Sequence, residues 1–232
     1  MPINQFNQPI GKSLPDYTTG SYPEVTLLSG KFCRLEKLSA AKHGADLYEV
    51  YAVEHSPMRN WTYLPIFPMA DHVEFDELMA GYEASADPYF FAIIDTASNR
   101  AVGSLSLMRI DTANRVIEVG WVVYSDALKR TRIATEAQYL LAKYVFETLK
   151  YRRYEWKCDA LNELSRKAAL RLGFQFEGIF RQAAVYKGRS RDTAWFSMID
   201  SEWSQSKARF ERWLDDTNFD EQGNQRVSLS EI

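Results

Sequence analysis

Within residues 116–141, the spacing of hydrophobic and polar positions changes from that of a β-strand to that of a helix. Val116–Tyr124 is rich in β-branched and aromatic residues, which predicts a β-strand. A polar turn at Ser125-Asp126 ends this run, and the next apolar residues share one helical face from Ile133 to Tyr144. We therefore expect a strand that leads through a turn into a helix over about 131–149.

The turn between this strand and this helix is strongly cationic, with the sequence Lys129-Arg130-Thr131-Arg132. The first turn of a helix has unpaired N–H groups and the positive end of the helix dipole, so cations there are unfavourable unless an anion binds among them. The segment predicts a phosphate-binding site. A solvated basic turn is the alternative interpretation.

The remaining pattern predicts one α/β domain. Strands are expected at 25–28, 31–38, 89–95, 101–110, 116–124, 151–160, 174–185 and 192–199, and helices at 41–53, 71–85, 131–149, 163–172 and 201–214. The strands at 89–124 form an antiparallel meander, whereas the helix between 116–124 and 151–160 makes those two strands parallel. We divide the chain into an extended arm (1–23), a domain (24–203) and a C-terminal helix with a polar, frayed tail (204–232).

Composition restricts the class of protein. Of the 232 residues, 46% are hydrophobic and 25% charged, and the net charge is −3. These values are ordinary for a soluble globular protein and argue against general nucleic-acid binding. No apolar run approaches the length of a membrane span, and we expect a cytoplasmic protein with no membrane partner. Cys33 and Cys158 lie in strand-like runs and are expected to be buried thiols in a reducing compartment.

The histidines and cysteines show no metal-ligand spacing. His43, His55 and His72 lie in or beside the early helices, so we expect no metal site. The segment 55–69 is different, because it holds three prolines and three aromatic residues without any period. A loop this apolar must be covered by the core or by a ligand.

The order of elements and several motifs resemble the GNAT acyl-CoA transferases, and more closely their RimJ/RimL-type branch. The family's pyrophosphate loop, Gln/Arg-x-x-Gly-x-Gly/Ala, corresponds to residues 129–134, and Thr135-Glu136-Ala137 continues it. The branch's downstream motifs Asn-x-x-Ser, Gly-Phe and Glu-Gly correspond to 162–165, 173–174 and 177–178. The resemblance covers about 25–203. It implies the GNAT fold, a mixed central sheet with splayed strands flanked by helices.

One departure from the family motif concerns glycine. The family usually has glycine at the place of Arg132, and often at that of Arg130, where backbone approaches the phosphates. Two arginines can instead supply charge-assisted bonds to a pyrophosphate. A loop that no longer holds the cofactor in the usual way is the alternative.

The resemblance implies transfer of an acetyl group from acetyl-CoA to an amine in a ternary complex, without a covalent enzyme intermediate. The implied cofactor contacts are Val122, Val123, Lys129, Arg130, Thr131, Arg132, Ile133, Ala134, Thr135, Asn162 and Ser165. Val122 and Val123 would bind the pantetheine arm through their backbone groups. Asn162 could also be only the N-cap of its helix. Ser165 would protonate or hydrogen-bond the departing sulfur.

Glu118 is the candidate general base. It lies mid-strand between Ile117 and Val119, where a carboxylate is unexpected unless it faces water or a cleft. Partial burial would raise its pKa usefully, whereas a strand residue that faces solvent would have no catalytic role.

Trp61, Tyr63 and Phe67 are candidates for the acceptor pocket, although aromatic loops pack over cores more often than they line sites. The expected acceptor is a protein N-terminal amine or a small-molecule amine, and a homodimer is possible. One alternative function is a non-catalytic acyl-CoA or nucleotide-binding module of the same fold. Another is an oligomeric interaction protein that uses exposed aromatic residues of 195–213.

Overall fold

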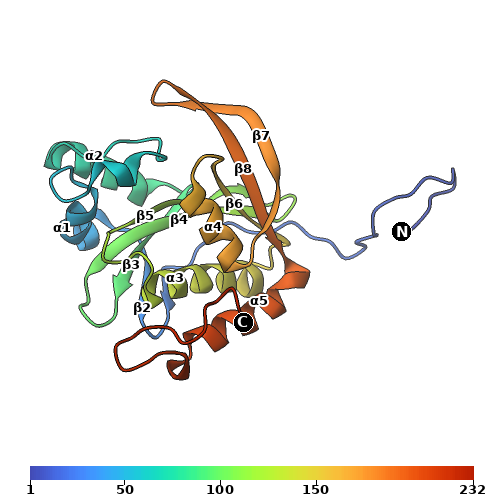
Figure 1. Cartoon of the computed structure of the whole chain (residues 1–232). Helices are drawn as coiled ribbons and strands as arrows, with labels where there is room; N and C mark the ends of the chain where they lie inside the picture. The colour runs from blue at the N-terminus through green and yellow to red at the C-terminus, as the bar shows by residue number, and fades with distance from the viewer.

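A single mixed sheet of eight strands organises the computed structural model, which describes all residues from 1 to 232 (Figure 1). The strands follow the spatial order β1-β2-β3-β4-β5-β6-β8-β7. Their bounds are β1 Leu27–Ser29, β2 Cys33–Lys37, β3 Tyr89–Asp95, β4 Ala101–Asp111, β5 Val116–Tyr124, β6 Arg153–Asp159, β7 Gln175–Tyr186 and β8 Arg189–Ile199. Neighbours are antiparallel except β5 and β6, which are parallel as predicted.

Five α-helices cover the two faces of the sheet. They are α1 Ala40–Tyr51, α2 His72–Ala84, α3 Arg132–Lys143, α4 Glu163–Leu172 and α5 Asp200–Leu214. A short 3₁₀ helix, η1, spans Met58–Trp61, a π-helical turn, η2, extends α3 over Tyr144–Thr148, and a 3₁₀ turn, η3, spans Asp216–Asn218. The predicted helix over 131–149 is therefore α3 followed by a π-helical turn. No helix is long and apolar enough to span a membrane.

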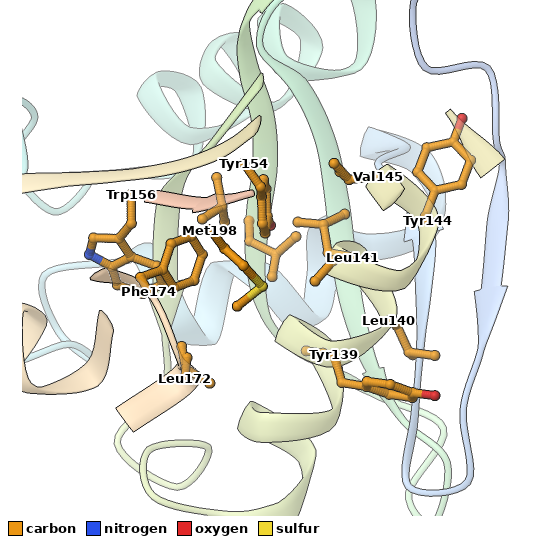
Figure 2. Close-up of a cluster of buried hydrophobic side chains, with 14 of the residues drawn as sticks. Tyr139, Leu140, Leu141, Tyr144, Val145, Tyr154, Trp156, Leu172, Phe174 and Met198 are labelled. Carbon is orange, nitrogen blue, oxygen red and sulfur yellow. The ribbon is translucent and has the colours of Figure 1, made fainter. Parts of the chain in front are cut away.

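The helices enclose two hydrophobic cores, one on each face of the sheet. The larger core joins α3, α4 and α5 to one face, and Figure 2 shows Leu141 and Val145 facing Tyr154 and Met198 across this layer. The smaller core joins α1, α2 and the loop before α2 to the other face, with Trp61 among its buried residues. Each face of the central strands is thus buried, as expected for a sheet with helices on both sides.

Local sequence signals explain several element boundaries. Asp71 caps α2 by accepting a hydrogen bond from the N–H of Glu74, and Gly173 ends α4 in the left-handed region at φ 98°. Ser39 precedes α1 but makes no side-chain cap; its own N–H donates to His43 Nδ1 instead. Both cysteines are free and buried, as the sequence predicted.

The C-terminal tail corrects one expectation from the sequence. It was expected to be frayed, but Leu229 is fully buried, Phe219 is 8% exposed, and Arg209 donates a hydrogen bond to the carbonyl of Leu229. The prediction of exposed aromatic residues over 195–213 is also wrong for most of them, since four of the five are buried: Phe196, Trp203, Phe210 and Trp213. The N-terminal arm projects away from the body (Figure 1).

Candidate functional site

The parallel strands β5 and β6 separate part-way along their length. Their pairing runs from Val116 with Arg153 to Val119 with Trp156 and then stops, although β5 continues to Tyr124 and β6 to Asp159. Trp121 has a φ of 49° at the point where the register between β4 and β5 shifts, so a β-bulge bends β5 there. The bulge and the lost pairing leave β5 and β6 unpaired beside Val122 and Val123, and this unpaired interval is here called the gap between the two strands.

The N-terminus of α3 follows the open end of β5. Thr131 caps the helix by accepting from the N–H of Ala134, and its hydroxyl donates to the carbonyl of Leu128. The backbone N–H groups of Arg130, Arg132 and Ile133 have no acceptor within the chain. Three free amides at the positive end of a helix form a suitable cradle for a phosphate group.

The three cations of this turn have different surroundings. Lys129 donates to Asp126 and Asn60, at 2.7 and 2.6 Å. Arg132 stacks on the ring of Phe219, 3.2 Å from its centroid, and pairs with Asp216 at 3.3 Å. Arg130 has no ion pair or side-chain hydrogen bond, and its φ of 64° is one that glycine tolerates best. Arg130 is therefore the cation that remains available to a bound anion, in a backbone conformation that fits the family's glycine.

Asn162 and Ser165 lie together at the start of α4. Asn162 is the N-cap, because its side-chain oxygen accepts from the N–H of Ser165 at 3.1 Å. The Ser165 hydroxyl accepts from Trp156 Nε1 at 3.0 Å. Both residues are partly exposed, and the amide nitrogen of Asn162 has no partner in the chain. The capping role and a role at the cofactor are thus compatible.

Glu118 is buried on the sheet face that carries the smaller core, at 5% exposure. Its Oε2 lies 2.9 Å from Lys157 Nζ and 3.3 Å from Arg109 Nε. Lys157 also contacts Glu155 at 2.6 Å and lies over the ring of Trp195. Burial raises the pKa of Glu118, and the charges of Lys157 and Arg109 oppose this rise. The expected alternative, a side chain that faces bulk solvent, is excluded by this burial.

The aromatic loop, residues 55–69, bridges the open ends of β5 and β6. On one side, Asn60 donates to Asp126 at 2.9 Å and Arg59 pairs with the same carboxylate at 3.1 Å. On the other side, the Tyr63 hydroxyl donates to the carbonyl of Leu161, just beyond β6, at 3.2 Å. The loop therefore crosses the mouth of the gap.

The three aromatic candidates in this loop have separate positions. Trp61 is a core residue at 1% exposure whose Nε1 donates to Ser56, although it also borders an open cavity. Phe67 lines the same cavity and is 55% exposed. Tyr63 contacts the start of the α4 region instead. The structure brings only Trp61 and Phe67 together at one cavity.

Sequence reasoning missed the partners of Glu118. Along β6, Arg153, Glu155 and Lys157 alternate with Tyr154, Trp156 and Cys158 of the larger core. This period of two placed three charged residues on the face opposite that core. The alternation was visible in the sequence and could have indicated a charged floor beside Glu118.

Comparison with known protein families shows to which family the chain belongs. Residues 34–175 match the family described as "Acetyltransferase (GNAT) domain". The chain belongs to the GNAT acetyltransferase family. The expected family, its RimJ/RimL-type branch and the mixed sheet with splayed strands are thereby confirmed.

Solved structures of other GNAT proteins share this fold over most of the chain. A GCN5-related N-acetyltransferase from Brucella melitensis is 47% identical with a TM-score of 0.91, and the match covers 94% of this chain and 98% of that one. A probable GNAT acetyltransferase from Chromobacterium violaceum is 39% identical with a TM-score of 0.78, covering 85% and 98% of the two chains.

A curated GNAT relative is similar over a shorter region. The protein named "Putative ribosomal N-acetyltransferase YdaF" of Bacillus subtilis (strain 168) is 31% identical over 105 residues, which are 45% of this chain. The match spans 57% of the length of that relative.

Proposed function

We propose that this protein is an acetyl-CoA-dependent N-acetyltransferase that acts on a primary amine by direct transfer in a ternary complex. The observation that carries the proposal is the gap between β5 and β6, which ends at three free amides of the α3 N-terminus. A sheet that parts beside a helix N-terminus suits a ligand with an extended arm and a pyrophosphate. Membership of the GNAT family supports acetyl-CoA as that ligand.

The donor side of the site would use the segment 129–135 and the open edges of the two strands. The free N–H groups of Arg130, Arg132 and Ile133 would bind the pyrophosphate, and the unpaired guanidinium of Arg130 would add charge-assisted bonds. Backbone groups of Val122 and Val123 would bind the pantetheine arm, where one N–H would polarise the thioester carbonyl. Asn162 and Ser165 would line the opposite side of this channel.

The acceptor side would require the removal and delivery of protons. The amine nitrogen attacks the thioester carbonyl carbon, the carbon–sulfur bond breaks, and the thiolate leaves as CoA. Glu118 would take the amine proton, directly or through water, because its raised pKa makes it a stronger base than an exposed glutamate. Ser165 would donate a hydrogen bond to the departing sulfur, with water completing the proton transfer.

The acceptor is proposed to be a protein N-terminal amine or a small-molecule amine. The ribosomal name of the relative from Bacillus subtilis supports testing N-terminal peptides of ribosomal proteins first. Polyamines and amine-containing antibiotics form the second group of acceptors.

Calorimetric titration with acetyl-CoA and a thiol-release assay with this panel test the proposal. We expect acetyl-CoA binding that weakens with salt, and release of CoA only when an acceptor amine is present. Absence of acetyl-CoA binding would refute the proposal. Binding without turnover on any acceptor would instead favour a non-catalytic acyl-CoA-binding module.

A further inference from the structure

A cavity of about 390 Å³ lies between the aromatic loop and the tip of the β7–β8 hairpin. Its apolar walls are Met58, Trp61 and Phe67, and its polar walls include Arg59, Lys187 and Arg189. The volume falls in the range of small-molecule and side-chain binding sites. The cavity therefore combines an apolar surface with three cations.

Two of these cations face the cavity without a carboxylate partner. Lys187 Nζ donates to the carbonyl of Trp61 at 2.7 Å, and Arg189 donates to the carbonyl of Thr62 at 2.8 Å. One such bond leaves further donors free on an ammonium with three N–H groups and on a guanidinium with five. Burial lowers the pKa of Lys187, and the nearby charge of Arg189 lowers it further. The third cation, Arg59, is paired with Asp126.

The hairpin tip between Lys187 and Arg189 has a defined backbone conformation. Tyr186 pairs with Arg189 across a two-residue turn, and both central residues have positive φ, 50° at Lys187 and 68° at Gly188. This is the geometry of a type I′ turn, in which asparagine or glycine is favoured at the first central position. A lysine at that position costs conformational free energy relative to asparagine or glycine.

The cavity adjoins the region where the acetyl group would be transferred. The loop that forms its apolar wall is also the loop that crosses the mouth of the gap between β5 and β6. An acceptor whose amine enters that gap would place its neighbouring groups against Phe67, Lys187 and Arg189. Lys187 lies 4.1 Å from the ring centroid of Phe67, so apolar and cationic contacts are adjacent.

We propose that this cavity recognises an anionic group, a carboxylate or a phosphate, carried by the acceptor next to an apolar group. The anion would accept hydrogen bonds from the free donors of Lys187 and Arg189, and the apolar part would lie on Met58 and Phe67. As a statement about the acceptor, this inference rests on the proposed acetyltransferase function. The cavity itself can be tested without turnover.

The first test measures binding of two isosteric probes to the wild-type protein by NMR titration. Phenylacetate should bind at millimolar concentration and at least about 10-fold more tightly than neutral phenylacetamide, and added salt should weaken it. This comparison needs no variant and no acetyl-CoA. Equal binding of the two probes, or binding of neither, would overturn the inference and leave the proposed function unaffected.

The second test compares acceptors in the thiol-release assay. One arm uses a Ser-Glu-Phe peptide against Ser-Gln-Phe, and the other uses phenylalanine against phenylalaninamide. We expect kcat/KM to be at least about 10-fold higher for the anionic member of the productive arm. Which arm is productive distinguishes an acidic peptide from a small anionic amine.

Variants assign this preference to the cavity. The Lys187→Gln/Arg189→Gln double variant should lose the preference for phenylacetate and for anionic acceptors. The control Arg191→Gln removes a cation of the same strand that bonds Thr193 instead, and it should keep both preferences. An undiminished preference in a folded double variant would overturn the assignment. If wild-type protein fails to bind acetyl-CoA, the proposed function fails, and the probe titration still decides whether the cavity binds anions.

Discussion

Lys157 and Glu118 form a buried ion pair across the parallel strands β6 and β5, with 2.9 Å between Nζ and Oε2. Both side chains are 7% exposed, and the same lysine contacts Glu155. One ammonium thus serves two buried carboxylates. The charge state of Glu118 therefore depends on Lys157, which lies far from it in the sequence.

Replacing Glu118 with glutamine tests the proposed base. The side chain keeps its shape and its hydrogen-bonding capacity, so the fold and acetyl-CoA affinity should persist. Turnover at pH 7 should fall by roughly 10²–10⁴-fold, and the loss should shrink at high pH, where more acceptor amine is already unprotonated. Glu155→Gln removes the other carboxylate on Lys157 and serves as the control. Wild-type activity of Glu118→Gln across the pH range would remove Glu118 from the mechanism.

Replacing Lys157 with methionine tests how the base is held in its charged form. Without the ammonium, the pKa of Glu118 should rise further, because burial is then opposed only by the charge of Arg109. The acidic limb of the kcat/KM profile should move to higher pH, and activity at pH 6 should fall more than activity at pH 9. A purely structural role for Lys157 would lower the melting temperature and leave the limb in place.

The same variant makes a signed prediction for stability. A carboxyl whose pKa is raised by folding favours the folded state below its unfolded pKa, and this contribution is lost as pH rises through the folded pKa. Lys157→Met should therefore lose stability more steeply than wild type as pH increases above about 4.3, the unfolded pKa of a glutamate. Removing one member of a buried pair should cost about 3–5 kcal/mol. Thermal unfolding measured from pH 4 to pH 9 checks both statements.

Arg130 and Arg132 should respond differently to substitution. Arg130→Asn keeps a residue that tolerates positive φ and removes the unpaired charge, so the melting temperature should hold while acetyl-CoA affinity falls about 10-fold and its salt dependence decreases. Arg132→Ala should lower the melting temperature, because Arg132 stacks on Phe219 and pairs with Asp216. Calorimetry and thermal unfolding separate the two effects. Unchanged affinity of Arg130→Asn would place the anion elsewhere.

The C-terminal tail should contribute measurably to stability. Leu229→Ala removes a fully buried side chain and should cost about 2–4 kcal/mol in the free energy of unfolding. Val227→Ala, at a 38% exposed position of the same tail, should cost less than about 1 kcal/mol. Similar small losses in both variants, measured by urea denaturation, would contradict the packed tail.

The elements were largely predictable because their signals are local. The strand at 116–124 and the helix ended by Gly173 lie where alternation and capping residues placed them. The contacts of the candidate site depend on residues far apart in sequence. Phe219 reaches Arg132, and Arg109 reaches Glu118, only after the chain has folded. The sequence of one segment therefore predicted a cationic turn but could not identify which of its three cations stays free.

The packed tail was missed for a related reason. A few apolar residues in a polar segment carry no periodic signal, yet Phe219 and Leu229 each fill a site formed by other elements. The mostly polar composition of 215–232 dominated the interpretation. The packing of Phe219 and Leu229 into the larger core nevertheless holds this polar segment against the domain.

The loop across the mouth of the gap joins the two halves of the site mechanically. Asn60 bonds both Asp126 and Lys129 of the turn before α3, and Trp61, its chain neighbour, borders the cavity at the hairpin tip. Any ligand that shifts the loop therefore alters both places at once. By thermodynamic reciprocity, the factor by which acetyl-CoA changes acceptor affinity must equal the factor by which the acceptor changes acetyl-CoA affinity. In the proposed enzyme, this loop would therefore couple the binding of donor and acceptor.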